Sequence, residues 1–217
     1  MHNLHDGAGG AVDGFSEFVS FFGKGGWFFI VLTAIFLLFK DRRKEGIGMA
    51  IALTFGALMT NIILKNAVAR VRPYNHDDLF YEWWVAAGSN FEKSTSFPSG
   101  HTTAATAAGV AFFILADKRY SFTGLIFAIV MAFSRIYLIV HYPTDVIVGL
   151  IVGTVGGVIG ALLSKLIYKK MRGKFADFIN NASIVTLTKN LIAKRKKKKE
   201  PVEEAEATES EVSENVL

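Results

Sequence analysis

Long apolar stretches alternate along this chain with short clusters of charged residues. A helix of about 20 apolar residues crosses the hydrocarbon core of a bilayer, and it satisfies its backbone hydrogen bonds within that one segment. The shorter stretches reach this length by extending into their polar flanks. We therefore predict an all-α fold, a multi-pass transmembrane helix bundle with five spans, at residues 26–39, 46–64, 102–116, 122–140 and 146–164.

The composition agrees with a membrane protein. Of the 217 residues 51% are hydrophobic and the mean hydropathy is +0.35, which is too apolar for an ordinary soluble domain. The net charge is +5, but the basic residues lie in short clusters between apolar stretches and form no patch on a soluble region, so we expect no nucleic-acid partner. The chain has no cysteine, which excludes disulfides and thiolate metal sites.

The N-terminal segment, residues 1–22, precedes the transmembrane domain at 23–172. Apolar residues recur at helical spacing over 12–22, with Asp13 and Glu17 off the apolar face. This pattern favours an N-terminal interfacial helix lying on the membrane, and a first span that continues into the next apolar stretch is the alternative.

Two further segments follow the transmembrane domain. Residues 173–194 mix apolar and polar side chains, and we expect a cytoplasmic surface helix there. Residues 195–217 are charged and lack aromatic side chains, which is typical of a disordered tail. The basic run at 194–199 either contacts anionic lipid headgroups or is simply solvated.

Basic clusters follow the first, third and fifth predicted spans, and the positive-inside rule places such clusters in the cytoplasm. The N-terminus then lies outside and the C-terminal tail inside. The opposite ends of the spans face outward and carry three polar clusters, which are Lys65 with Arg72, residues 98–101, and Arg135 with His141 and Asp145. We therefore expect a cell-membrane protein whose site lies on the extracytoplasmic face.

Lys65 and Arg72 are seven residues apart, so both are predicted to point from one face of a helix that Pro73 ends. Two such cations suit a phosphate group, and the alternative is a pair of snorkelling side chains at a helix end. Arg70 lies off that face, and we assign it a structural or secondary contact.

The second cluster, at 98–101, precedes an apolar helix. Ser99 is predicted to cap this helix, and Gly100 lets the backbone approach a phosphate closely. His101 has the right chemistry to protonate a leaving oxygen near neutral pH. An ordinary helix cap beside a surface histidine is the alternative.

In the third cluster, Asp145 lies one helical turn from His141. A carboxylate in that position holds one ring nitrogen and leaves the other as a nucleophile. Arg135 adds a forked donor for phosphate oxygens. Capping alone would explain this pair too, but the coincidence of three such clusters on one membrane face favours an enzyme that removes phosphate from a lipid.

Together the clusters resemble the three-part signature of the type 2 phosphatidic acid phosphatase superfamily. The matching motifs, which lie within about residues 46–164, are Lys65-x6-Arg72-Pro73, Pro98-Ser99-Gly100-His101 and Ser134-Arg135-x5-His141-x3-Asp145.

The resemblance implies an all-helical fold and a two-step reaction that needs neither a metal nor another cofactor. It assigns the attack on phosphorus to His141, assisted by Asp145, and proton transfer to the leaving group and from water to His101. It assigns the phosphate to a cradle formed by Lys65, Arg72, Arg135, Ser99 and the backbone of Gly100.

The small size and the outward-facing site resemble bacterial undecaprenyl diphosphatases and phosphatidylglycerophosphate phosphatases. We expect hydrolysis of a phosphomonoester or diphosphate of a membrane lipid, foremost undecaprenyl diphosphate. Phosphatidylglycerophosphate or phosphatidate hydrolysis and lipid phosphotransfer remain alternatives, since they share the phosphohistidine half-reaction. A lipid-binding scaffold is the non-enzyme alternative, but every candidate catalytic position is filled.

Overall fold

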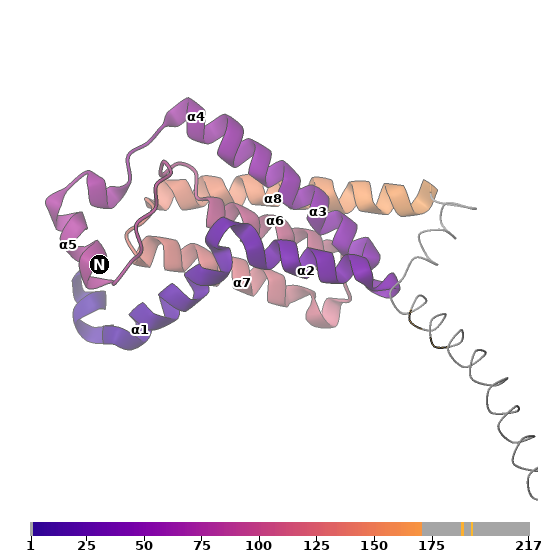
Figure 1. The fold of residues 1–217 in the computed structure, drawn as a ribbon, viewed down its shortest axis with the longest axis horizontal. Coiled ribbons are helices and arrows are strands. Elements are labelled where there is room, and N and C mark those ends of the chain that lie inside the picture. The colour runs from indigo at the N-terminus through magenta and orange to yellow at the C-terminus, as the bar shows by residue number, and fades with distance from the viewer. Residues whose placement is uncertain (1, 171–187, 189–191, 193–217) are drawn as a thin grey trace, which may run out of the picture.

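The computed structural model describes residues 2–170 together with Thr188 and Ile192. Within these residues the chain is helical and contains no strand, as predicted. The long helices lie side by side along the longest axis of the molecule and form a bundle (Figure 1). The predictions for 173–194 and 195–217 lie outside the described residues, apart from those two isolated positions.

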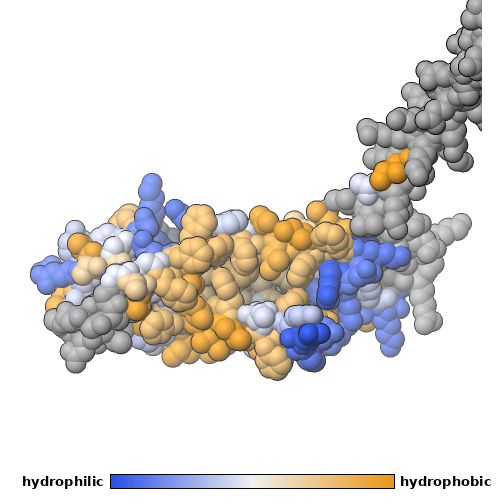
Figure 2. Space-filling view, turned by 90° about the horizontal axis from the view of Figure 1, so that it is seen from below, coloured by the Kyte–Doolittle hydropathy of each residue, from blue (hydrophilic) through white to orange (hydrophobic). Residues whose placement is uncertain are grey.

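All five predicted spans are helical. They correspond to α2 (Trp27–Leu38), α3 (Arg43–Ala57) with its π-helical continuation η3 (Leu58–Leu64), α6 (Gly100–Leu115), α7 (Lys118–Tyr137) and α8 (Pro143–Lys170). Within the described residues, four helical segments are long and apolar enough to cross a membrane, and α6 is apolar but shorter. Figure 2 shows a broad apolar band between polar ends, and isoleucines of α7 and α8 are more than half exposed on the bundle surface: Ile126, Ile129, Ile147 and Ile151. Exposed apolar side chains of this kind suit contact with lipid.

Helix α6 packs against α3, α7 and α8, and its buried face is made of small residues. Helix α8 approaches this face through glycines. An added Cβ would lie 2.8 Å from the Thr103 carbonyl oxygen at Gly153, and 3.0 Å from the Ala107 carbonyl oxygen at Gly157. The glycine-rich face of α8 therefore serves close packing inside the bundle.

The N-terminal helix α1 (His2–Gly23) contains residues 12–22, which were predicted to be helical, and begins ten residues earlier (12 − 2). The short turn η1 (Lys24–Gly26) then breaks the chain direction, because Gly25 and Gly26 have φ of 62° and 70°. Helix α1 packs against α7 and lies obliquely to the bundle (Figure 1). Its predicted place in the membrane interface stays a prediction, since Gly10–Leu38 taken together is also long enough to span.

The chain between Lys65 and His101 covers one end of the bundle. It contains the short helix α4 (Lys65–Val68), the turn η4 (Pro73–Asn75) and the helix α5 (Asp78–Ala86), before an irregular segment leads into α6. Asp77 caps α5, since its side chain accepts a hydrogen bond from the Leu79 backbone at 2.9 Å.

The prediction that one helix carries Lys65 and Arg72 was wrong. Helix α4 ends at Val68 because Ala69 adopts a left-handed conformation with φ of 47°. Arg72 is extended, with φ of −74° and ψ of 154°, which is the conformation that a following proline favours. Pro73 therefore begins a turn instead of ending a helix.

Candidate active site

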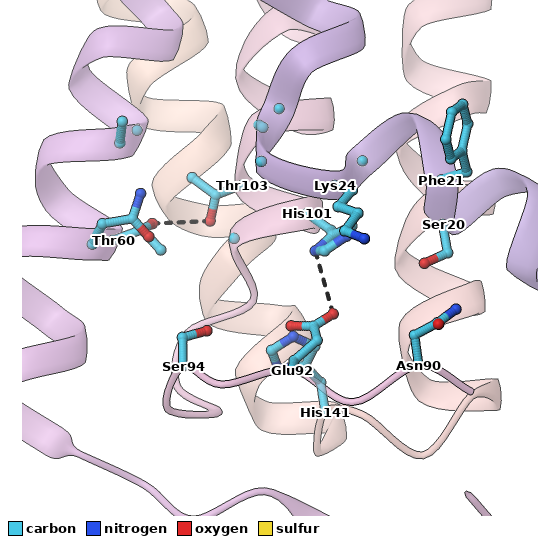
Figure 3. Close-up of a pocket in the computed structure, with 18 of the residues that line it drawn as sticks. Ser20, Phe21, Lys24, Thr60, Asn90, Glu92, Ser94, His101, Thr103 and His141 are labelled. Carbon is cyan, nitrogen blue, oxygen red and sulfur yellow. Dashed lines mark hydrogen bonds and ion pairs between the residues drawn. The ribbon is translucent and has the colours of Figure 1, made fainter. Parts of the chain in front are cut away.

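The three polar clusters come together at one end of the bundle, around a cavity of about 890 Å³. The beginnings of α6 and α8, the end of α7 and the segment after α4 all contribute to this region. Figure 3 shows His101 at the start of α6, with Glu92 of the preceding segment and His141 beside it. Four of the predicted site residues line the cavity: Lys65, Gly100, His101 and His141. The other four are buried around it: Arg72, Ser99, Arg135 and Asp145.

His141 lies between a carboxylate and a guanidinium. Its Nδ1 is 3.7 Å from Oδ2 of Asp145, and its Nε2 is 3.3 Å from Nη1 of Arg72. An arginine only donates, so Nε2 is the unprotonated acceptor and the ring proton sits on Nδ1, facing Asp145. The nitrogen with the free electron pair therefore faces the cations, as a nucleophile toward phosphate requires.

Asp145 is fully buried and held on both oxygens. Arg70 donates to Oδ1 at 2.9 Å, while the Ser96 hydroxyl and the Tyr142 backbone donate to Oδ2 at 2.5 Å and 3.0 Å. The predicted secondary role of Arg70 is confirmed by this contact. The carboxylate is thereby fixed in position beside the His141 ring.

Arg72 and Arg135 are 2% and 1% exposed, and both bind the same carboxylate. Arg72 Nη2 donates to Glu92 Oε2 at 2.6 Å, and Arg135 Nη1 donates to Glu92 Oε1 at 3.4 Å. The Nδ1 atom of His101 is 4.0 Å from the same Glu92 Oε1 (Figure 3). An anion thus already occupies the point where the two guanidinium groups and His101 converge.

Arg135 retains an unused donor, because its buried Nη2 has no hydrogen-bond partner among the described residues. An unpaired buried donor is costly, and an additional anionic oxygen at this place would satisfy it. The carboxylate of Glu92 has two oxygens, whereas a phosphate offers more. The donor set around Glu92 therefore matches a phosphate better than it matches a carboxylate.

Sequence reasoning missed three residues of this site, Glu92, Ser94 and Ser96. They lie in the irregular segment before α6, where neither helical spacing nor a motif points to them. Ser94 Oγ accepts from Lys65 Nζ at 3.0 Å and from Arg72 Nη2 at 3.1 Å. This segment therefore connects the Lys65 and Arg72 side chains, which the backbone alone does not align.

Ser99 is the N-cap of α6, as predicted, and its Oγ accepts hydrogen bonds from Thr102. Its backbone N–H donates to the Asp145 carbonyl at 3.1 Å, which links the second and third clusters. Gly100 lies at the cavity surface, whereas Ser99 is not among the residues that line it. The predicted phosphate contact of Ser99 stays a prediction.

Burial lowers the pKa of His141 to about 4 and outweighs the hydrogen bond with Asp145, which acts in the opposite direction. The imidazole is therefore neutral at neutral pH and takes up its proton only as the pH falls through about 4. In protein labelled with ¹⁵N-histidine, we expect the His141 ring signals to stay constant from about pH 8 to about pH 5. The signals are assigned by their loss in His141→Ala. A titration midpoint near the ordinary value of about 6.5 would contradict the expectation.

The amino-acid sequence of this chain is similar to those of several known phosphatases. The chain is 30% identical over 138 residues to an undecaprenyl-diphosphatase of Sulfolobus acidocaldarius, a match that covers 64% of each chain. It is 32% identical over 154 residues to a lipid A 1-phosphatase of Rhizobium johnstonii, covering 62% of this chain and 60% of that protein. The match thus spans less than two thirds of the length of these two relatives.

Two further comparisons bear on the family and the fold. A decaprenylphosphoryl-5-phosphoribose phosphatase of Mycolicibacterium smegmatis is 33% identical over 133 residues, covering 60% of this chain and 67% of that one. The crystal structure of Aquifex aeolicus LpxE superposes with a TM-score of 0.57 at 21% identity, over 72% of this chain and 89% of that one, which supports the fold. The family model of the PAP2 superfamily matches residues 45–172, a range that is more than half of the chain and contains the eight predicted site residues. The protein therefore belongs to the PAP2 superfamily.

Proposed function

We propose that this protein is an integral membrane phosphatase that removes phosphate from a membrane lipid. The observation that carries the proposal is the Glu92 carboxylate held by Arg72 and Arg135 beside His101. It marks an anion position that adjoins the neutral Nε2 of His141. A phosphate at this position would lie between a nucleophile and an acid, the arrangement that phosphoryl transfer needs.

In the first step, Nε2 of His141 attacks phosphorus and a P–N bond forms. The bond from phosphorus to the leaving oxygen breaks, and its electron pair stays on that oxygen. His101 enters this step protonated, a form that the negative charge of the bound phosphate favours, and gives its proton to the leaving oxygen. The guanidinium groups of Arg72 and Arg135 balance the charge on the transferring group. Asp145 stabilises the positive charge that develops on the His141 ring.

In the second step, water attacks the phosphohistidine. The neutral His101 formed in the first step accepts a proton from this water, the P–N bond breaks, and His141 returns to its neutral form. Inorganic phosphate leaves, and both histidines are restored. Neither step uses a metal ion, because the charge is balanced by the arginines and Lys65.

The lining of the cavity supports a lipid substrate. From the polar end with Lys65 and both histidines it extends to apolar side chains of α2 and α3, Ile30 and Leu53. The foremost candidate is undecaprenyl diphosphate, on which the Sulfolobus relative acts by its name. A lipid phosphomonoester is the second candidate, favoured by the lipid A phosphatases among the relatives.

The proposed orientation places this cavity on the extracytoplasmic face and the C-terminal tail in the cytoplasm. Basic residues lie at the opposite end of the bundle, in η2 (Lys40–Arg42), at the start of α7 and at the end of α8. The positive-inside rule favours a cytoplasmic location for that end. Contact of the basic tail with anionic lipids stays a prediction.

The experiment is a substrate panel on purified protein in detergent. Undecaprenyl diphosphate, phosphatidylglycerophosphate, phosphatidate and a soluble phosphate ester are compared by initial phosphate release, with and without EDTA. We expect release from at least one lipid and equal rates in EDTA. Release from none of the lipids would favour the scaffold alternative, and a second lipid that becomes phosphorylated in place of water would indicate phosphotransfer. Loss of activity in EDTA would contradict the metal-independent mechanism.

A further inference from the structure

Lys24 is a cation of the cavity that the catalytic steps leave without a role. It lies in the turn η1, between α1 and α2, and lines the cavity together with Lys65 and His101. The family model begins at residue 45, so this lysine belongs to a part of the chain outside the shared region. A side chain outside the shared region is better suited to selecting the substrate of this protein than to carrying out the reaction steps that the family shares.

The turn η1 packs against α6, and Gly23, the residue directly before this turn, packs against the His101 ring. A Cβ added to Gly23 would overlap Cδ2 of the His101 ring and lie 2.9 Å from Sδ of Met131, so only glycine permits this approach. On the other side of the turn, Trp27 Nε1 donates to the Phe21 carbonyl at 2.9 Å and the Trp27 backbone N–H bonds to the Lys24 carbonyl. The backbone of Lys24 is therefore held beside His101, as Figure 3 also shows.

The side chain of Lys24 is available for a ligand. It is exposed at the cavity, and within residues 10–170, whose side chains the structure describes, it has no hydrogen-bond or ion-pair partner. The two carboxylates that line the same cavity are engaged elsewhere: Glu92 with the buried arginines, and Glu17 with Asn90 Nδ2 at 3.3 Å. A lysine ammonium is a mobile point charge that suits a phosphate group.

The reaction geometry decides which part of a substrate meets Lys24. In an in-line displacement the attacking nitrogen of His141 and the leaving oxygen lie on opposite sides of phosphorus. His101 protonates the leaving oxygen, so the leaving group lies on the His101 side, where η1 packs. For a lipid monophosphate this group is a neutral alcohol, but for a lipid diphosphate it is a phosphate that carries negative charge.

We infer that Lys24 forms a subsite beside His101 for the anionic leaving group of a lipid diphosphate. This inference rests on the proposed phosphatase function and narrows its substrate class. Lys24 binds the phosphate that stays on the lipid, while Arg72 and Arg135 bind the phosphate that is transferred. Lys24 is a specificity-determining residue, because its charge acts on diphosphates and has no anionic partner in the leaving group of a monoester.

The test compares farnesyl diphosphate with farnesyl monophosphate, which share one chain and differ by one phosphate. Initial phosphate release is measured for the wild-type protein and for Lys24→Gln and Lys24→Arg. We expect Lys24→Gln to lower the ratio of kcat/KM for the diphosphate to kcat/KM for the monophosphate by about 10-fold or more. Lys24→Arg, which keeps the charge, is expected to retain most of the ratio. Lys40→Gln, at the opposite end of the bundle, is the matched control.

Each outcome separates the two proposals. If the wild-type protein releases phosphate from neither compound nor from any lipid of the panel, the phosphatase function fails. If it hydrolyses both compounds and Lys24→Gln leaves the ratio unchanged, only the subsite is wrong. Lys93 is a second exposed lysine that lines the cavity. If Lys93→Gln lowers the ratio as much as Lys24→Gln does, the subsite is also wrong, because the preference for the diphosphate would then come from the overall positive charge of the cavity and not from Lys24.

Discussion

Replacing His141 with alanine is expected to abolish phosphate release, by at least about 10³-fold in kcat. The substitution removes the nitrogen that attacks phosphorus, and no neighbouring group replaces it, since Asp145 is held by Arg70 and Ser96. Purified variant and wild-type protein are compared by initial phosphate release at saturating substrate. Radiolabelled substrate adds a direct readout, because the wild-type chain acquires an acid-labile, base-stable label typical of phosphohistidine and the variant acquires none.

The matched control for this variant is His76→Ala. His76 is exposed in the segment before α5 and has no assigned part in the site, so its loss is expected to leave the rate within a factor of about two. Size-exclusion profiles establish that both variants remain folded. Activity in folded His141→Ala comparable to that of the wild type would remove the nucleophile assignment, whatever the substrate.

Replacing Arg135 with lysine is expected to lower kcat/KM by about 10² to 10³-fold, the usual effect of losing one donor to the transition state. Lysine keeps the positive charge at position 135 but lacks the planar, forked guanidinium group of arginine. Arginine at this position offers Nη1, now bound to Glu92, and the buried Nη2 that has no partner among the described residues. Lysine presents a single ammonium group and cannot hold two oxygens in the same plane.

The Arg135 measurement includes a control on the same helix. Arg119 is exposed near the start of α7, at the end of the bundle opposite the cavity, so Arg119→Lys is expected to be neutral. Vanadate, an analogue of the transferring phosphate, gives a second readout, since its inhibition constant should rise in Arg135→Lys. If Arg135→Lys keeps more than half of the wild-type kcat/KM, Arg135 does not contact the transferring group.

Glu92 gives the two buried arginines, Arg72 and Arg135, an internal counter-ion. Buried guanidinium groups without a counter-ion are strongly unfavourable, so this internal carboxylate stabilises their burial. In the proposed mechanism, a substrate phosphate takes the place of this carboxylate beside Arg72 and Arg135. The bond to Tyr74, whose hydroxyl donates to the Glu92 carbonyl at 3.1 Å, holds the backbone of the same segment.

Much of the site could be predicted because its residues lie at helix ends. Ser99 and His101 begin α6, Arg135 lies in the last turn of α7, and Asp145 lies in the first turn of α8. The apolar stretches fixed the order and direction of these helices. The connection between α7 and α8 is short, although it turns sharply at Ile139, whose φ is 55°, and it leaves Arg135 and Asp145 at the same end of the bundle.

Arg72 shows where this reasoning failed. Its spacing from Lys65 fits a helix face, but Ala69 ends the helix and the extended chain carries Arg72 into the bundle by another route. The guanidinium group still reaches the predicted place, 3.3 Å from His141 Nε2. The side chain is long, and the Ser94 carbonyl and the Val140 carbonyl hold it by hydrogen bonds of 2.7 Å and 2.9 Å.

The sequence alone determined the all-helical membrane fold, the five apolar helices and the motif residues, because hydrophobic length and helix-end chemistry are local properties. Only the tertiary structure decided the parts that depend on contacts between distant segments. These parts are the Glu92 carboxylate between the two arginines, the fixing of Asp145 by Ser96, and the packing of the Lys24 turn on His101. No local pattern encodes them, since each arises where a loop or turn meets a helix far away in the chain.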